Sequence, residues 1–421
     1  MPSLPLLLLL WAASSYSFPV FHNGDRQNVE TVWKYLENYY NLGKNMQAKN
    51  VNGKEMMAEK LRQMQQLFGR NILNYTPYLP KAVVEDAIAR AFRVWSDVTP
   101  LTFQRVFEEE GDIVLSFHRG DHGDNNPFDG PNYKLAHTFQ PGPGLGGDVH
   151  YDLDETWTNS SENFNLFYVT AHELGHSLGL THSSDIGALM FPSYTWYTED
   201  FVLNQDDINR IQDLYGPSPN PIQPTGATTP HPCNGDLTFD AITTFRGEVF
   251  FFKGRFYIRV NRFMPEPELN LIGILWPNLP VKLDAAYEAS MIDQVRYFKG
   301  SKVWAVQEQS VLRGFPRDIH SFFGFPSNVT HIDAAVCEEE TGKTYFFVDH
   351  MYWRYDENTQ SMDPGYPRLT AEDFPGIDDK VDDVFQKGEN FYFFHQSVQH
   401  RFNLQIRRVD DSRDSSTWFN C

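Results

Sequence analysis

His172-Glu-Leu-Gly-His176-Ser-Leu-Gly179-Leu-Thr-His182 is the most informative stretch of this 421-residue chain, and it has the pattern HExxHxxGxxH. In a helix, His172 and His176 project from one face about one turn apart. Gly179 can end that helix with a backbone angle that other residues resist, which lets His182 approach as a third ligand. Three imidazoles on Zn²⁺ leave a fourth position open for water, and this predicts a catalytic zinc site.

Glu173 directly follows the first histidine and is expected to take a proton from the zinc's water. Met190 follows the third histidine and is expected to lie beneath the ligands as an apolar support. The alternative is a core helix with scattered histidines, but core packing does not require this spacing. The pattern with its later Met resembles the metzincin zinc peptidases.

Charge and the N-terminal sequence narrow the class of protein. The chain has 35 basic and 55 acidic residues, a net charge of −20, which disfavours nucleic acid as a partner. Residues 1–17 read as a secretory signal peptide, because an apolar run is followed by small residues. No later apolar run is long enough to span a membrane. We therefore expect an exported protein, and three sequons at Asn74, Asn159 and Asn328 are compatible with a glycoprotein.

Changes in composition predict the domain boundaries. Residues 18–69 read as a helical segment, and 70–216 read as a globular domain. In that domain we expect helices at 81–94 and 204–215 and a buried strand at 112–117. A linker rich in Pro, Ser, Thr and Gly follows at 217–232. The remainder, 233–421, repeats a short motif.

That motif is an aspartate among apolar residues, followed by an aromatic strand pair, and four copies recur at intervals of 44, 49 and 49 residues. Four such units predict a four-bladed β-propeller. A disulfide between Cys233 and Cys421 would join the fourth blade to the first, with Cys337 left over. The repeated aspartates are expected to face the channel and bind a cation, or else to be solvated turn residues. They are Asp240, Asp284, Asp333 and Asp382.

A second set of metal-binding residue types precedes the zinc helix. Three histidines and one aspartate would make a closed four-ligand set, which suits a structural zinc, although surface histidines are a competing interpretation. The set is His122, Asp124, His137 and His150. The glycine-rich stretch 142–148 contains a formal GxGxxG, but no helix follows it and the next residues are acidic. Calcium fits this loop better than a nucleotide.

Several further motifs make the chain resemble a matrix metalloproteinase along almost its whole length. They include Gly-Asp-His122-Gly-Asp124, Pro127-Phe-Asp-Gly-Pro131 and Pro141-Gly-Pro-Gly-Leu-Gly-Gly-Asp148. The resemblance implies an α/β metzincin catalytic domain, with a twisted mixed sheet and three helices, followed by an all-β four-bladed hemopexin-like propeller. Asp185 and Gly187 match positions that mark collagenases in the family, whereas Phe164 stands where a Tyr is usual.

The resemblance also implies ligands and partners. One calcium would use Asp129, Gly130, Asp152 and Glu155, and a second would use Asp112, Gly144, Gly146 and Asp148. Tyr168 and Tyr194 are expected to contact substrate, with the Tyr168 ring making the S1′ pocket shallow. The implied partners are extracellular matrix proteins such as collagen and proteinaceous metalloproteinase inhibitors, and the chain is expected to be a monomer in the extracellular matrix.

The main departure from the family pattern lies upstream of the catalytic domain. The chain passes from Gly69 directly to Arg70, without the cysteine switch, the third propeptide helix or most of the first strand of the sheet. Two consequences compete: an enzyme free of latency, or a shortened sheet too unstable to fold well.

The leading hypothesis is therefore a secreted zinc- and calcium-dependent endopeptidase that hydrolyses matrix proteins, with interstitial collagen as the specific substrate. One alternative is a stromelysin-like peptidase that does not cut triple-helical collagen. The other is a catalytically inert propeller protein that binds matrix.

Overall fold

The computed structural model describes residues 67–107, 111–195, 197, 201–219, 228–261, 267–377 and 380–421. The chain divides into two compact units, Met1–Thr229 and Pro230–Cys421. The expected signal peptide at 1–17, and the expected propeptide up to residue 66, lie outside the described residues. In the part of the chain that is described, no helix has the length and apolar character needed to cross a bilayer.

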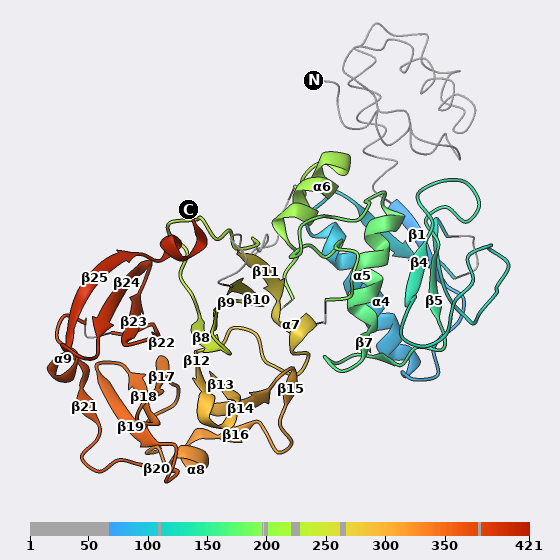
Figure 1. The fold of residues 1–421 in the computed structure, drawn as a ribbon. Helices are drawn as coiled ribbons and strands as arrows, with labels where there is room; N and C mark the ends of the chain where they lie inside the picture. The colour runs from blue at the N-terminus through green and yellow to red at the C-terminus, as the bar shows by residue number, and fades with distance from the viewer. Residues whose placement is uncertain are drawn as a thin grey trace, which may run out of the picture. The chain divides into compact units, whose positions relative to one another are not determined.

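The first unit contains a five-stranded sheet in the order β2-β1-β3-β5-β4, in which only β4 runs antiparallel to its neighbour (Figure 1). Its strands are β1 (Leu67–Ile72), β2 (Thr102–Arg105), β3 (Ile113–His118), β4 (Ala136–Thr138) and β5 (Val149–Asp152). The helices described here are α4 (Lys81–Ser96), α5 (Leu166–Ser177) and α6 (Gln205–Tyr215), and a short pair joins β6 (Trp157–Thr158) to β7 (Phe164–Asn165). The mixed sheet with three helices confirms the expected fold of the catalytic domain.

Apolar periodicity explains how α4 packs. Its buried residues, from Val84 to Trp95, recur every three or four positions, so they form one face toward the core. The indole Nε1–H of Trp95 donates a 2.9 Å hydrogen bond to the carbonyl of Ala171 in α5. This contact ties the two helices together beside the sheet.

The sequence predicts a shortened first strand, and the structure shows which residues form it. It has six residues and pairs with β2 on one side and β3 on the other. Leu67, Phe68 and Gly69, which composition alone places in the propeptide, make its first half and pair with Thr102 to Gln104. The Phe68 ring stacks on Phe103 with centroids 5.8 Å apart. A strand requires backbone pairing and one apolar face rather than a particular sequence, so these residues complete the sheet.

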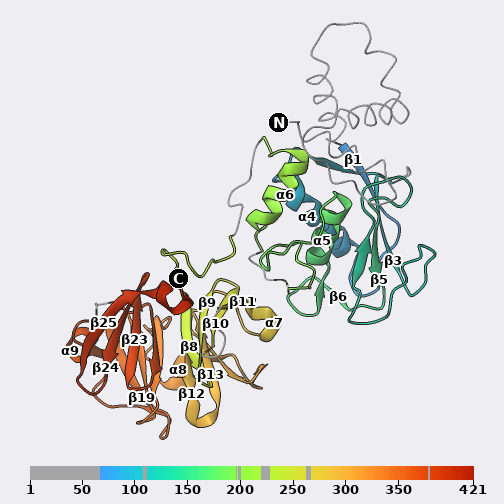
Figure 2. The same cartoon turned by 45° about the horizontal axis from the view of Figure 1, so that its top comes forward.

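The second unit is a propeller of four antiparallel sheets (Figures 1 and 2). The first blade contains β8 (Ala241–Phe245), β9 (Glu248–Lys253), β10 (Phe256–Val260) and β11 (Glu268–Leu271), followed by α7 (Ile272–Leu275). The second contains β12 (Ala285–Ala289), η2 (Ser290–Ile292), β13 (Gln294–Lys299), β14 (Lys302–Gln307), β15 (Ser310–Val311) and β16 (Arg317–Asp318), then α8 (Ile319–Phe323). The third contains β17 (Ala334–Glu338), β18 (Lys343–Val348), β19 (Met351–Asp356), β20 (Ser361–Met362) and β21 (Arg368–Leu369), then α9 (Thr370–Asp373). The fourth contains β22 (Asp383–Lys387), β23 (Asn390–His395), β24 (Val398–Asn403) and β25 (Arg408–Asp414), then η3 (Ser415–Phe419). The predicted four-bladed propeller is confirmed.

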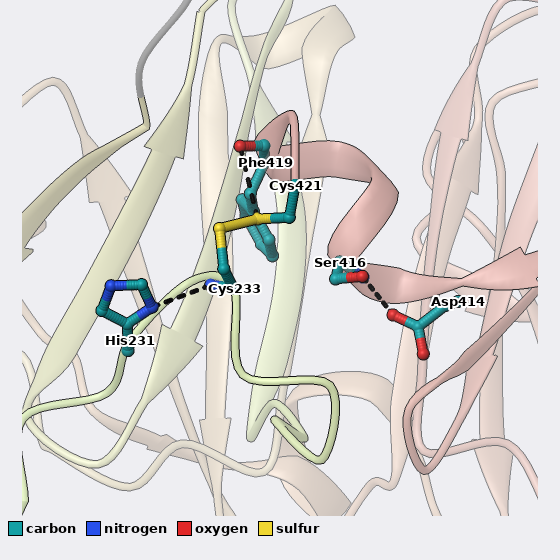
Figure 3. Close-up of a disulfide and its surroundings, with 6 residues drawn as sticks. All are labelled: His231, Cys233, Asp414, Ser416, Phe419 and Cys421. Carbon is teal, nitrogen blue, oxygen red and sulfur yellow. Dashed lines mark hydrogen bonds between the residues drawn. A yellow bond between two sulfur atoms is a disulfide. The ribbon is translucent and has the colours of Figure 1, made fainter.

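A disulfide joins the two ends of this unit (Figure 3). It links Cys233, before the first blade, to Cys421 at the end of the fourth, as the sequence predicts. Nearby, the Asp414 carboxylate accepts a 2.8 Å hydrogen bond from the Ser416 N–H, and this bond begins η3. Cys337 is a free and buried thiol in the third blade, and burial raises its pKa to about 12.

Candidate metal centres and active-site cleft

Helix α5 presents the first two histidines of the motif. The Asn165 side chain begins it by accepting a 3.0 Å hydrogen bond from the Tyr168 N–H. The helix ends at Ser177, and Gly179 follows with φ +96°, a conformation that favours glycine. The chain therefore turns and places His182 beside His172 and His176, as the spacing predicts.

Carbonyl oxygens orient two of these imidazoles. Nδ1 of His172 lies 2.7 Å from the Leu189 carbonyl oxygen, and Nδ1 of His176 lies 2.8 Å from that of Leu180. Each Nδ1 must therefore carry the proton, which leaves Nε2 free as a metal ligand. Burial lowers the pKa of His172 to about 4 and also lowers that of His176, so both are neutral at pH 7. Ligand atoms of all three histidines lie within 4.8 Å of one another, a donor set that fits zinc.

Glu173 follows His172 in the sequence, and its side chain is buried. It contacts β4, at the edge of the sheet. Its Oε2 accepts a 2.7 Å hydrogen bond from the Thr138 hydroxyl on β4. Burial raises the pKa of the Glu173 carboxyl. Thr138 therefore holds one carboxylate oxygen in place, a contact between distant segments that sequence analysis missed.

Met190 lies fully buried under the zinc helix. A Cβ on Gly175 would come within 2.3 Å of the Met190 Sδ, so only glycine leaves room for this packing. The buried Asp207 carboxylate accepts hydrogen bonds of 2.6 and 3.0 Å from the N–H groups of Leu189 and Met190. Asp207 thereby holds the loop whose Leu189 carbonyl orients His172. In the sequence, Asp207 showed only as an acidic residue in the first turn of a helix.

A cleft of about 510 Å³ opens beside the three histidines. Tyr168 and Tyr194 both line it, together with His172 and His182. The Tyr168 hydroxyl lies 2.5 Å from the Thr195 Oγ1, and its ring packs edge-on against Tyr194 at 5.7 Å. These contacts hold the Tyr168 ring in the wall of the cleft. This position agrees with the prediction that Tyr168 contacts substrate.

The second histidine cluster also comes together. Oδ2 of Asp124 lies 2.8 Å from Nε2 of His122, 2.7 Å from Nε2 of His137 and 2.8 Å from Nδ1 of His150. The Gly120 carbonyl oxygen lies 2.9 Å from Nδ1 of His122, which leaves the Nε2 of that ring to the cluster. Four N and O donors converging at one point fit a four-coordinate zinc.

The first expected calcium set shows one feature that suits a cation. Oδ2 of Asp152 is buried and has no hydrogen-bond partner among the described residues. Burial raises the pKa of the Glu155 carboxyl, and the nearby carboxylates of Asp152 and Asp129 raise it further. Gly130 has φ +89° and turns the loop over these groups. Asp152 and Glu155 are both buried, and two buried carboxylates this close are costly unless a cation neutralises them, which favours calcium here.

The second expected calcium set surrounds the glycine loop. Gly144 has φ +71°, and a Cβ on Gly146 would come within 2.1 Å of the Gly142 backbone, so this loop requires glycine. Oδ1 of Asp148 accepts a 3.0 Å hydrogen bond from the Val114 N–H. One oxygen of Asp112 accepts a bond from Gly69 N–H. Calcium binding by the loop carbonyls and by the remaining carboxylate oxygens stays a prediction.

The four propeller aspartates share one role in the fold. Each accepts a backbone N–H from a hairpin turn of its own blade: Gly254 for Asp240, Gly300 for Asp284, Asp349 for Asp333 and Gln396 for Asp382. All four line a cavity of about 400 Å³. Their oxygens do not gather within 4.8 Å as the two histidine clusters do in the described residues. Propeller calcium therefore remains a prediction.

A helix that presents HExxH, a third histidine from the next loop and a buried methionine below them define a zinc metalloendopeptidase of the metzincin class. The matrixin family model matches residues 65–216, and the hemopexin model matches 239–281, 283–327 and 332–379. The chain belongs to the matrix metalloproteinases, which are zinc-dependent endopeptidases. The fourth blade, not matched by the hemopexin model, is evident from β22–β25.

Known proteins of this family are similar along the whole chain. Interstitial collagenase A of Mus musculus is 90% identical, with 100% of each chain aligned. Interstitial collagenase of Equus caballus is 54% identical, covering 100% of this chain and 99% of that protein, and neutrophil collagenase of Homo sapiens is 46% identical, covering 100% and 98%. The alignment with the first spans 464 positions against 421 residues here, a difference of 43, so this chain carries a gap of about that size.

Proposed function

We propose that the chain is a secreted, zinc- and calcium-dependent endopeptidase that hydrolyses extracellular matrix proteins, with interstitial collagen as its specific substrate. The observation that carries the proposal is the convergence of three imidazoles next to the buried Glu173, at a cleft that His172 and His182 line. His172, His176 and His182 are assigned to the catalytic zinc, and the cluster around Asp124 to a structural zinc. Proteinaceous metalloproteinase inhibitors are the expected regulators, and the chain is expected to act as a monomer.

The chain's own residues supply the proton transfers. Zinc held by His172, His176 and His182 would polarise the scissile carbonyl and lower the pKa of its water to about 7. Glu173 accepts a proton from the attacking water and returns it to the leaving amine nitrogen. Thr138 holds the second oxygen of Glu173 while this proton moves. Tyr168 and Tyr194 position the P1′ side chain in the cleft.

The proposal that collagen is the substrate rests on the names of the relatives and on two residues, Asp185 and Gly187. Three of these relatives are called collagenases. At the collagenase marker positions, the Asp185 Oδ1 accepts a 2.8 Å hydrogen bond from the Gly187 N–H and a 2.5 Å bond from the Thr229 hydroxyl. Both bonds hold the loop that follows the third zinc histidine.

The test compares the full chain with its Glu173→Gln variant, without any activating treatment. A quenched fluorogenic peptide and triple-helical type I collagen are the two substrates. Zinc-dependent cleavage of both by the parent alone would support the proposal, and a chelator should abolish it. The chain has no cysteine before Cys233, so no thiol from the upstream segment can block the zinc.

Two other results would favour the alternatives. Cleavage of the peptide and of gelatin, but not of native collagen, would indicate a stromelysin-like peptidase. No cleavage by folded, zinc-loaded protein that still binds collagen would indicate a matrix-binding propeller protein.

A further inference from the structure

A pocket of about 560 Å³ lies between the second and third blades of the propeller, and no role above uses it. Its lining comes from η2, β13 and α8 of the second blade and from the end of β19 in the third. Both blades belong to one compact unit, so the pocket is a feature of the propeller itself.

Arg296 is the unusual group in this pocket. It lies on β13 and is only 7% exposed. Its Nε is buried without a hydrogen-bond partner, and within the described part of the chain no carboxylate forms an ion pair with it. The guanidinium carbon lies 5.5 Å from the Phe315 ring centroid and 5.1 Å from that of Phe322. Aromatic faces partly stabilise the cation, but a buried charge without a counter-ion remains costly.

The other charged groups of the lining do not neutralise Arg296. Arg317 adds a second cation and packs on Phe322 at 4.8 Å. Among the described residues that line the pocket, Glu357 is the single acidic one. Its Oε1 already accepts hydrogen bonds of 2.8 Å from the Tyr287 hydroxyl and 2.6 Å from the Thr344 hydroxyl. The lining therefore carries two cations and one carboxylate that is already hydrogen-bonded, so its net charge is positive.

The remaining wall combines apolar side chains with the amides of Gln294, Asn358 and Gln360, and apolar residues lie at its rim. Met291 and Ile292 are adjacent in η2 and are 58% and 46% exposed. They line the same pocket as Phe315 and Phe322. Exposed apolar side chains beside a buried cation match a ligand that joins an apolar group to an anion.

We propose that this pocket binds an amphipathic carboxylate. The carboxylate pairs with the Arg296 guanidinium, whose planar donors suit two parallel hydrogen bonds. The attached apolar group packs on Phe315, Phe322 and the rim formed by Met291 and Ile292. Such chemistry is found in a free fatty acid and in a peptide with a leucine next to a glutamate. The proposal does not depend on the peptidase function.

The experiment is calorimetric titration of the full chain, in a Glu173→Gln background so that no peptide is hydrolysed. The probes are decanoate, 1-decanol, acetyl-Leu-Leu-Glu-amide and its Gln counterpart. If the natural ligand is a fatty acid, decanoate should bind at least tenfold more tightly than 1-decanol. If the natural ligand is a peptide, the Glu peptide should bind more tightly than its Gln counterpart. Failure of both carboxylates to bind would overturn the proposal.

Arg296→Met tests the cation, because it keeps a long apolar side chain and removes the charge. It should weaken carboxylate binding at least tenfold and leave binding of 1-decanol unchanged. Arg408→Met, at an exposed position on β25, is the matched control and should bind like the parent. Equal carboxylate affinity in parent and Arg296→Met would contradict the assignment.

A second variant keeps the test informative if Arg296→Met does not fold. Ile292→Glu places a like charge at the exposed rim and should also weaken carboxylate binding. Cys337 lines the pocket and is buried, so slow reaction of its thiol with a disulfide reagent reports a folded pocket in each variant. Unchanged carboxylate binding in folded Ile292→Glu would exclude this rim from the site.

Discussion

The backbone N–H of Gly69 donates a 2.7 Å hydrogen bond to Oδ2 of Asp112. By composition, Gly69 is the last residue of an upstream helical segment, whereas Asp112 lies directly before β3. A Cβ on the neighbouring Gly111 would come within 3.0 Å of the Gly69 carbonyl oxygen, so the two segments are in close contact. Residues 67–69 are therefore part of the catalytic sheet.

The first prediction concerns this strand. Phe68→Ala should lower the free energy of unfolding by about 1–3 kcal/mol, since a partly buried ring loses its packing on Phe103. Chemical denaturation of the full chain would measure the change. Leu73→Ala, at a side chain that is 63% exposed, is the control and should change stability little. Equal effects of the two substitutions would mean that Phe68 does not support the sheet.

Thr138 should act as a positioning residue for Glu173. Thr138→Val removes the donor to Oε2 and should reduce kcat about tenfold or more, with KM nearly unchanged. Thr138→Ser keeps a hydroxyl and should restore most of the activity. Steady-state kinetics on a fluorogenic peptide would decide, and a Val variant as active as the Ser variant would argue against this role.

The Tyr168 ring should set the depth of the S1′ pocket. Tyr168→Ala would remove the wall and shift preference toward long P1′ side chains in a peptide library. Tyr168→Phe keeps the ring and loses only the contact with Thr195, so its preference should stay close to that of the parent. If the Ala variant retains the parent's P1′ profile, another residue forms the end of the pocket.

Glu85 should make stability depend on pH. Hydrogen bonds from Arg105 and then from Tyr75 lower the pKa of the Glu85 carboxyl to about 2. A pKa of about 4.3 for an unfolded glutamate means that this stabilisation is present above pH 4.3 and is lost as the pH falls toward 2.

Glu85→Gln should therefore be less stable than the parent at pH 6, and the difference should shrink between pH 4 and pH 2. Denaturant unfolding of both proteins across this range is the measurement. Glu162→Gln, at an exposed position, is the control and should show no such trend. A parent–variant difference that is constant with pH would show that the Arg105 contact does not matter for folding.

The disulfide should account for much of the propeller's stability. Its cysteines are 188 residues apart, and the chain-entropy estimate for a loop of that length is about 5 kcal/mol. Cys421→Ser should lower the denaturation midpoint of the propeller and make it insensitive to reductant. Cys337→Ser should leave the effect of reductant intact. Unchanged unfolding of the parent after full reduction would contradict the prediction.

Patterns of regular period predicted most of the fold. The helix expected at 81–94 is α4, Lys81–Ser96, and the one expected at 204–215 is α6, which Asn204 caps through a 2.8 Å bond to the Asp206 N–H. The strand expected at 112–117 is β3, Ile113–His118. These predictions succeeded because helix and strand periodicity are local properties of the chain.

Sequence reasoning did not place residues 67–69 in β1 and did not find Thr138 or Asp207. Residues 67–69 have no strand pattern of their own and become strand only between β2 and β3. Thr138 reaches Glu173 across 35 residues, and Asp207 reaches Leu189 across 18. Such contacts depend on how elements pack, which no local pattern reports.

By itself, the sequence determined the zinc helix, both histidine clusters, the repeat number of the propeller and the disulfide partners, because ligand spacing and repeat period are written along the chain. Only the tertiary structure decided which residues complete the sheet, which groups orient His172 and Glu173, and that Arg296 is buried without a carboxylate partner among the described residues. The physical reason is that packing and hydrogen bonding between distant segments are set by the whole fold, whereas periodicity and ligand spacing are local.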